Sequence, residues 1–233
     1  MTSVYGAVPE CREALKGPFS KGGSMRRYLT ETIGTFFLVL TIGLTAVSGF
    51  DQAPLAIGAI LMVMVYMGGH VSGAHYNPAV SLAVMMRGKL SRGDFGAYCG
   101  SQLAGALLAA LAVKAMTGST FAPMPDAGAS LTSVLLAEFL FTFALALVVL
   151  QVATSPKTEG NSYYGLAIGA TVAAGAMAVG GISGGAFNPA VGFGPTIINT
   201  VFGGGSPESL WIYLVAPLLG GAVAATAYRF QER

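Results

Sequence analysis

Two short stretches of the chain carry nearly the same residues, Ser72-Gly-Ala-His-Tyr-Asn-Pro-Ala-Val80 and Ser183-Gly-Gly-Ala-Phe-Asn-Pro-Ala-Val191. They agree at six of nine positions and lie 111 residues apart. Other pairs keep nearly that offset: Glu31 before Thr35-Phe36 recurs as Glu138 before Thr142-Phe143, and Gln102-Leu-Ala-Gly recurs loosely as Pro217-Leu-Leu-Gly. Self-similarity at a nearly fixed offset indicates that the chain is a duplicated unit.

The composition is that of a membrane protein. Only 9% of the 233 residues are charged, against about 25% in an ordinary soluble domain, while 54% are apolar and the mean hydropathy is +0.67. The net charge of +2 gives no basic patch, so we expect no nucleic-acid partner. Two distant cysteines, Cys11 and Cys99, support neither a disulfide scaffold nor a Cys-rich metal site.

Six apolar stretches approach the length of about 20 residues that a membrane-spanning helix needs. They are residues 28–50, 54–70, 95–117, 131–153, 163–181 and 209–228. We expect a first repeat over residues 28–122 and a second over 123–228, between a polar cytoplasmic tail at 1–27 and a short C-terminal segment at 229–233. Because each repeat holds three spans, an odd number, the second must enter the membrane from the opposite face, and the repeat is inverted.

The basic residues indicate the orientation in the membrane. Lys and Arg near the ends of spans are retained on the cytoplasmic side, and eleven of the twelve fall on the side of both termini. Lys114 alone lies near the other face. We therefore predict a multi-pass integral protein in the lipid bilayer of a plasma or inner membrane, with both termini cytoplasmic.

Each repeated Asn-Pro-Ala segment continues into an apolar stretch too short to span a bilayer, residues 77–86 and 188–200. Asn is favoured at a helix N-cap and Pro at the first helical position, so Asn77-Pro78 and Asn188-Pro189 predict two helix starts. We expect re-entrant half-helices that enter from opposite faces and bring their N-termini together near the middle of the membrane.

Two facing helix N-termini form an electrostatic barrier to cations. Each carries a partial charge of roughly +0.5 together with unpaired N–H groups. A water molecule can turn its oxygen toward these donors, but a file of water is then oriented oppositely on either side, which breaks the chain along which a proton hops. The sequence therefore predicts a channel that conducts water and excludes protons and ions.

The paired boxes Asn77-Pro78-Ala79 and Asn188-Pro189-Ala190, the Glu-x-x-x-Thr-Phe starts and the Gln-x-x-Gly-Ala stretch resemble the aquaporin, or major intrinsic protein, family over about residues 27–228. The resemblance implies an all-α membrane protein with six transmembrane helices and two re-entrant half-helices in an inverted repeat. It also implies a homotetramer with one pore per subunit, which passively conducts water or small neutral solutes.

Glu31 and Glu138 are ionisable groups predicted inside spans, which raises the question of a proton relay. The resemblance implies a structural role instead, in which each carboxylate accepts hydrogen bonds from backbone N–H groups of a re-entrant segment.

The resemblance further implies a selectivity filter formed by Ile57, Ala176, Gly185 and Val191, counted from the two Asn residues. Most members carry an Arg where this chain has Val191, and strictly water-selective members often carry a His at the position of Ala176. The run Val191-Gly-Phe-Gly-Pro195 is similar to a plant vacuolar subgroup, although Ile57 replaces the His expected there. We expect a wider and less polar filter, which passes ammonia, urea, glycerol or hydrogen peroxide as well as water.

No pattern in the sequence predicts an enzyme. The two histidines, His70 and His75, have no Asp, Glu or Cys close by and make a poor metal site, so we expect neither a metal nor another cofactor. His75 is expected to line the cytoplasmic vestibule. Two other interpretations stay open: a coupled secondary transporter, which also uses inverted repeats with broken helices, and a weakly conducting junctional membrane protein.

Two pairs of glycines are spaced to share a helical face, Gly96 with Gly100 and Gly165 with Gly169. Small residues let membrane helices approach closely, so all four are expected at contacts between helices.

Overall fold

The structure, a computed structural model, describes residues 21–232. In this part of the chain six helices are long and apolar enough to cross a membrane. They are α1 (Lys21–Ser48), α2 (Ala53–Ser72), α4 (Arg92–Thr117), α5 (Leu131–Thr154), α6 (Tyr164–Ser183) and α8 (Leu210–Gln231). Two shorter helices, α3 (Pro78–Met86) and α7 (Pro189–Phe202), and a single 3-10 turn, η2 (Pro156–Thr158), complete the described elements. The all-α fold class predicted from the sequence is confirmed.

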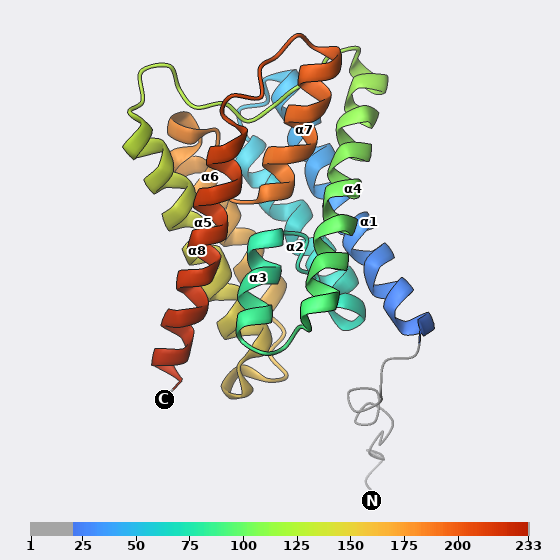
Figure 1. Cartoon of the computed structure of the whole chain (residues 1–233), viewed down its shortest axis with the longest axis vertical. Coiled ribbons are helices and arrows are strands. Elements are labelled where there is room, and N and C mark those ends of the chain that lie inside the picture. Colours follow the sequence, from blue (N-terminus) through green and yellow to red (C-terminus); the bar gives the residue numbers. More distant parts are fainter. Residues whose placement is uncertain (1–20, 233) are drawn as a thin grey trace, which may run out of the picture.

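The two short helices lie among the long ones and approach the middle of the bundle from opposite ends (Figure 1). We call the end at which α1 begins and α8 ends the terminal face, and the other end the opposite face. Within the first repeat α1 packs on α4, and within the second α5 packs on α8. Helices α2 and α6, one from each repeat, pack on each other. Across the repeats α4 lies along α7, and α8 lies along α3. Each repeat therefore supports the half-helix of the other.

The half-helices begin where the Asn-Pro pairs predict. Asn77 and Asn188 have extended backbones, and their side chains accept hydrogen bonds from the N–H groups of Ala79 and Ala190 at 2.8 and 2.9 Å. Pro occupies the first helical position in both, where its missing N–H costs nothing. The nine residues of α3 rise roughly 14 Å, about half of a hydrocarbon core of about 30 Å.

The spans before the two half-helices end in the same way. Gly73 follows α2 with a φ of 87°, and Gly184 follows α6 with a φ of 85°. This left-handed conformation favours glycine, and the N–H of Gly73 or Gly184 itself donates to a carbonyl of the last turn, that of Gly69 or Gly180, at 3.0 and 2.9 Å. The chain then turns back into the bundle instead of leaving it.

The helix bounds differ from the predicted ones mainly at the first span. Helix α1 begins at Lys21, so residues 21–27 of the predicted tail form its first turns. The last of them, Arg27, forms an ion pair with Asp94 of α4. The rest of that tail, residues 1–20, lies outside the described residues. Helix α7 continues to Phe202 and α8 to Gln231.

The expectation about glycines is correct for one pair only. A Cβ at Gly165 would meet the ring of Tyr66, and one at Gly169 would meet the carbonyl of Gly58. A Cβ at Gly96 or Gly100 would meet nothing within 4 Å among the described residues, so the prediction that these two lie at contacts between helices of this chain is wrong. Helical spacing shows that two residues share a face, but not toward which side that face points.

Candidate pore

The N-termini of α3 and α7 meet in the middle of the bundle. The side-chain nitrogen of Asn77 donates to the carbonyl of Phe187 at 2.9 Å, and that of Asn188 donates to the carbonyl of Tyr76 at 2.9 Å. Each Asn thus bonds its own helix through its oxygen and the other repeat through its nitrogen. These bonds fix the distance and direction of the two tips.

The residues that accept these bonds have an unusual backbone. Tyr76 and Phe187 have φ values of 49° and 48°, in the left-handed region that costs side-chain-bearing residues free energy. Both are almost fully buried, with 0% and 2% of their surface exposed. Such a conformation persists only where the surroundings enforce it, and two buried carboxylates supply that constraint.

Glu31, on α1, accepts four hydrogen bonds. The donors are the hydroxyl of Ser72, the backbone N–H groups of His75 and Tyr76, and the side-chain amide of Gln102, at 2.7, 3.0, 2.7 and 2.8 Å. Because these donors lie at the end of α2, on the segment that follows it and on α4, the carboxylate connects these parts of the chain to α1.

Glu138, on α5, has the equivalent place in the second repeat. It accepts from the hydroxyl of Ser183 at 2.7 Å and from the backbone N–H groups of Ala186 and Phe187 at 3.0 and 2.7 Å. The side-chain donor corresponding to Gln102 is missing, since Pro217 stands at that position. Both carboxylates are fully buried, and their contacts are those of structural acceptors for the re-entrant segments.

A cavity of about 500 Å³ runs beside the two tips. Its lining includes both Asn side chains, His75 and all four residues expected to form the filter, which are Ile57, Ala176, Gly185 and Val191. These four residues come from α2, α6, the segment after α6 and the start of α7. Their side chains offer neither a charge nor a hydrogen-bond donor to the cavity.

One part of the lining was not foreseen from the sequence. Phe121 and Met124, in the connection between α4 and α5, also line the cavity. The ring of Phe121 lies where a Cβ of Gly43 would stand, and the N–H of Asp126 donates to the carbonyl of Ile182 at 3.0 Å. The only signal was an apolar Phe-Ala-Pro-Met run in a segment otherwise rich in Gly, Ser and Thr.

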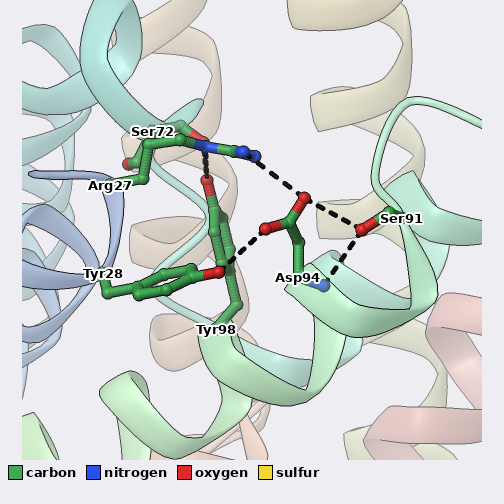
Figure 2. A network of polar contacts seen from close by, with 6 residues as sticks. All are labelled: Arg27, Tyr28, Ser72, Ser91, Asp94 and Tyr98. Atoms are coloured by element: carbon green, nitrogen blue, oxygen red, sulfur yellow. Dashed lines mark hydrogen bonds and ion pairs between the residues drawn. The ribbon is translucent and has the colours of Figure 1, made fainter. Parts of the chain in front are cut away.

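A polar network lies at the terminal face (Figure 2). Arg27 donates to the hydroxyl of Tyr98 at 2.8 Å and forms an ion pair of 3.4 Å with Asp94. Asp94 also accepts from the hydroxyls of Tyr28 and Ser91, both at 2.9 Å. The network joins the start of α1 to the start of α4 and so braces the terminal face near the re-entrant segment.

Cations lie near the outer ends of both half-helices. Arg229 donates to the carbonyl of Met86, the last residue of α3, and the ammonium group of Lys114 lies 5.2 Å from the ring centre of Phe202, the last residue of α7. Helix C-termini carry a partial negative charge that cations stabilise. Lys114 and Arg229 are 115 residues apart, close to the repeat offset, so this arrangement is duplicated as well.

Comparison with known proteins gives the same family for most of the chain. Residues 18–228 match the family model described as "Major intrinsic protein". "Aquaporin NIP1-1" from Oryza sativa subsp. japonica is 36% identical over 230 residues, which cover 94% of this chain and 76% of that protein. "Aquaporin NIP1-2" from Arabidopsis thaliana is 33% identical over 223 residues, or 88% of this chain and 73% of that protein.

The fold is also found in a solved structure, the aquaglyceroporin from Plasmodium falciparum. The TM-score is 0.79 at 24% identity, and the match covers 88% of this chain and 95% of that one. Together with the inverted repeat and the two facing half-helices, these matches show that the chain belongs to the major intrinsic protein family, the aquaporins, and is a passive membrane channel for water and small solutes rather than an enzyme.

Proposed function

We propose that the cavity conducts water together with ammonia, urea, glycerol and hydrogen peroxide, and that it excludes protons and ions. One observation carries this proposal: the N-termini of α3 and α7 meet beside the cavity, with Asn77 and Asn188 both in its lining. Two helix N-termini place about half a positive charge each at this level. Cations are repelled there, whereas a water molecule turns its oxygen toward the donors.

The solute range follows from the filter. Ile57, Ala176, Gly185 and Val191 line one cavity and bring no charged group to it, so selection at this level depends on size. A filter Arg would add a fixed positive charge and several donors, and Val191 supplies neither. Without an Arg side chain at position 191 the opening is wider, so small neutral solutes meet less steric exclusion than they would at a narrower, charged constriction.

We also propose that the terminal face is cytoplasmic, in a plasma or inner membrane. Among the described residues, the basic side chains lie at or near that face with the exception of Lys114, as expected for residues retained on the cytoplasmic side. We further propose a homotetramer with one pore in each subunit. The outward surfaces of α2 and α6, with Leu55, Leu166 and Met177 about half exposed, are apolar enough to face lipid or another subunit.

The experiment is a flux assay in proteoliposomes. Light scattering follows the volume change driven by gradients of each of the four solutes and of an impermeant sugar, while an internal pH dye reports proton flux. We expect fast water flux, solute fluxes linear in the gradient, and proton flux equal to that of protein-free liposomes. Exclusion of all solutes but water would refute the wide filter, and saturable flux that depends on Na⁺ or H⁺ would indicate a coupled transporter.

A further inference from the structure

A chain of buried polar side chains connects the carboxylate of Glu31 to the ring of His75. The side-chain nitrogen of Gln102 lies 2.8 Å from Oε2 of Glu31 and 3.0 Å from Oγ of Ser81. Oγ of Ser81 lies 3.1 Å from Nδ1 of His75. Gln102 and Ser81 are fully buried, and His75 is 8% exposed.

The positions of the protons in this row of hydrogen-bonded side chains follow from the groups at its two ends, Glu31 and His75. Ser72 and two backbone N–H groups already donate to Glu31, so Gln102 must turn its NH₂ group, and not its oxygen, toward the carboxylate. Both N–H groups of Gln102 are then used, one on Glu31 and one on Ser81. Among the described residues, the buried oxygen of Gln102 has no hydrogen-bond partner, which costs about 1–3 kcal/mol in general.

The hydroxyl of Ser81 therefore accepts from Gln102, and its own proton needs another acceptor. Within the part of the chain that the structure describes, the acceptor in reach of that hydroxyl is Nδ1 of His75. A ring nitrogen that accepts a hydrogen bond carries no proton, so the proton of the neutral imidazole is on the other nitrogen.

We propose that Ser81 and Gln102 are positioning residues that hold His75 in the tautomer protonated at Nε2, so that the ring presents an N–H donor to the cavity. His75 belongs to the cavity lining, and its ring is also held against that of Tyr98, with 5.1 Å between centres. A Cβ at position 73 would come within 3.1 Å of Nε2, so Gly73 keeps the space beside this nitrogen open.

The second repeat provides an internal comparison. At the positions equivalent to His75, Ser81 and Gln102 it has Ala186, Gly192 and Pro217. All three hydrogen-bonding side chains are therefore absent from the second repeat. The fixed donor thus belongs to the terminal half of the channel, whereas the other half has the apolar filter. That the donor meets permeating molecules rests on the proposed function, but the tautomer of His75 does not.

The test is nitrogen NMR of the full-length protein in lipid bilayers, with ¹⁵N- and ¹³C-labelled histidine. Because the chain has two histidines, a His70→Gln variant leaves His75 as the one reporter, and one-bond N–C couplings assign each nitrogen. We expect a single tautomer, with the proton on Nε2. A proton on Nδ1, or a mixture of tautomers, would overturn the proposal.

Variants of the two positioning residues make the test specific. Ser81→Ala removes the hydroxyl that donates to Nδ1 of His75. Gln102→Met removes the donor to the Ser81 hydroxyl, which can then accept a hydrogen bond from a protonated Nδ1. Each variant should therefore add the signals of the tautomer protonated at Nδ1. Ser101→Ala is the matched control, since its hydroxyl bonds the carbonyl of Ala97 on the same helix and should leave the spectrum unchanged.

Unchanged spectra in both Ser81→Ala and Gln102→Met would refute the role of Ser81 and Gln102 as positioning residues, even if Nε2 of His75 carries the proton. Water flux, measured separately on the same liposomes, reports the channel function. A wrong assignment of the His75 tautomer is thus distinguished from a failure of the proposed function.

Discussion

Tyr98 and Tyr213 make the same hydrogen bond at opposite ends of the channel. The hydroxyl of Tyr98 donates to the carbonyl of Ser72 at 2.7 Å, and that of Tyr213 donates to the carbonyl of Ser183 at 2.6 Å. Both side chains are fully buried, and each fixes the end of the span that precedes a half-helix. The two differ in one respect, because Tyr98 also accepts a hydrogen bond from Arg27.

This difference predicts unequal effects of the same substitution. Tyr213→Phe removes one neutral hydrogen bond, which should lower the free energy of unfolding by about 1 kcal/mol. Tyr98→Phe also removes the acceptor of a charged group, so the loss should be about 2–4 kcal/mol. Equilibrium unfolding in mixed micelles measures both. Equal losses would show that the bond between Arg27 and Tyr98 contributes nothing.

The two carboxylates predict a second asymmetry. A Glu→Gln substitution replaces one carboxylate oxygen by an NH₂ group. The donors that bonded that oxygen then face another donor and lose their acceptor. At Glu31 each oxygen has two donors, but among residues 21–232 the one donor to Oε2 of Glu138 is the N–H of Phe187. Glu31→Gln should therefore cost about 2–6 kcal/mol and Glu138→Gln about 1–3 kcal/mol, at 1–3 kcal/mol for each buried donor left without a partner.

The exposed Glu159 provides the control for these two variants, since Glu159→Gln should stay within about 0.5 kcal/mol of the wild type. The same unfolding measurement applies. A larger loss at Glu138 than at Glu31 would contradict this description of the two sites.

The glycines of α6 and α4 predict opposite responses to an added methyl group. Gly169→Ala places its Cβ against the carbonyl of Gly58 and 2.7 Å from Cβ of Met62, and overpacking of this kind costs about 1–3 kcal/mol. Gly96→Ala meets nothing within 4 Å among the described residues and lies inside α4, so it should raise stability by about 0.5–1 kcal/mol, because Gly is less favourable than Ala in a helix. Thermal unfolding of the two variants in detergent compares them, and a neutral Gly169→Ala would contradict the close contact of α2 with α6.

Val191→Arg should narrow the solute range. The longer side chain enters the cavity at the filter and adds a positive charge, so glycerol and urea permeability should fall at least about tenfold, a difference of about 1.4 kcal/mol in barrier, while water flux falls less. Val201→Arg, at a position that is 64% exposed, is the control for an added charge. Equal decreases for water and glycerol would mean that position 191 does not select by size.

The features of the fold that could be predicted from the sequence are those whose motifs occur in both repeats. The offset between the two Asn-Pro-Ala boxes, with three spans in each repeat, predicts the inverted arrangement and both half-helix starts, because Asn and Pro have strong local preferences at these positions. The pairing of each Asn with the other repeat also follows once the tips are placed together.

Other parts of the site depend on contacts that no local pattern contains. Phe121 reaches the cavity from an aperiodic connection, so periodicity gave no sign of it. Gln102 could be recognised as a mark of the repeat, but its bonds to Glu31 and Ser81 depend on the rotation of α4 relative to α1 and α3. Gly96 and Gly100 show the same limit, since their outward direction is set by that rotation.

The electrostatic barrier at the tips of α3 and α7 is the central claim, and simultaneous measurement of water and proton flux through the wild-type channel in liposomes tests it most directly. With a pH gradient and a membrane potential applied, we predict that water flux rises with the amount of protein while proton flux stays at the level of protein-free liposomes. A proton flux that rises in proportion to the water flux would contradict the claim.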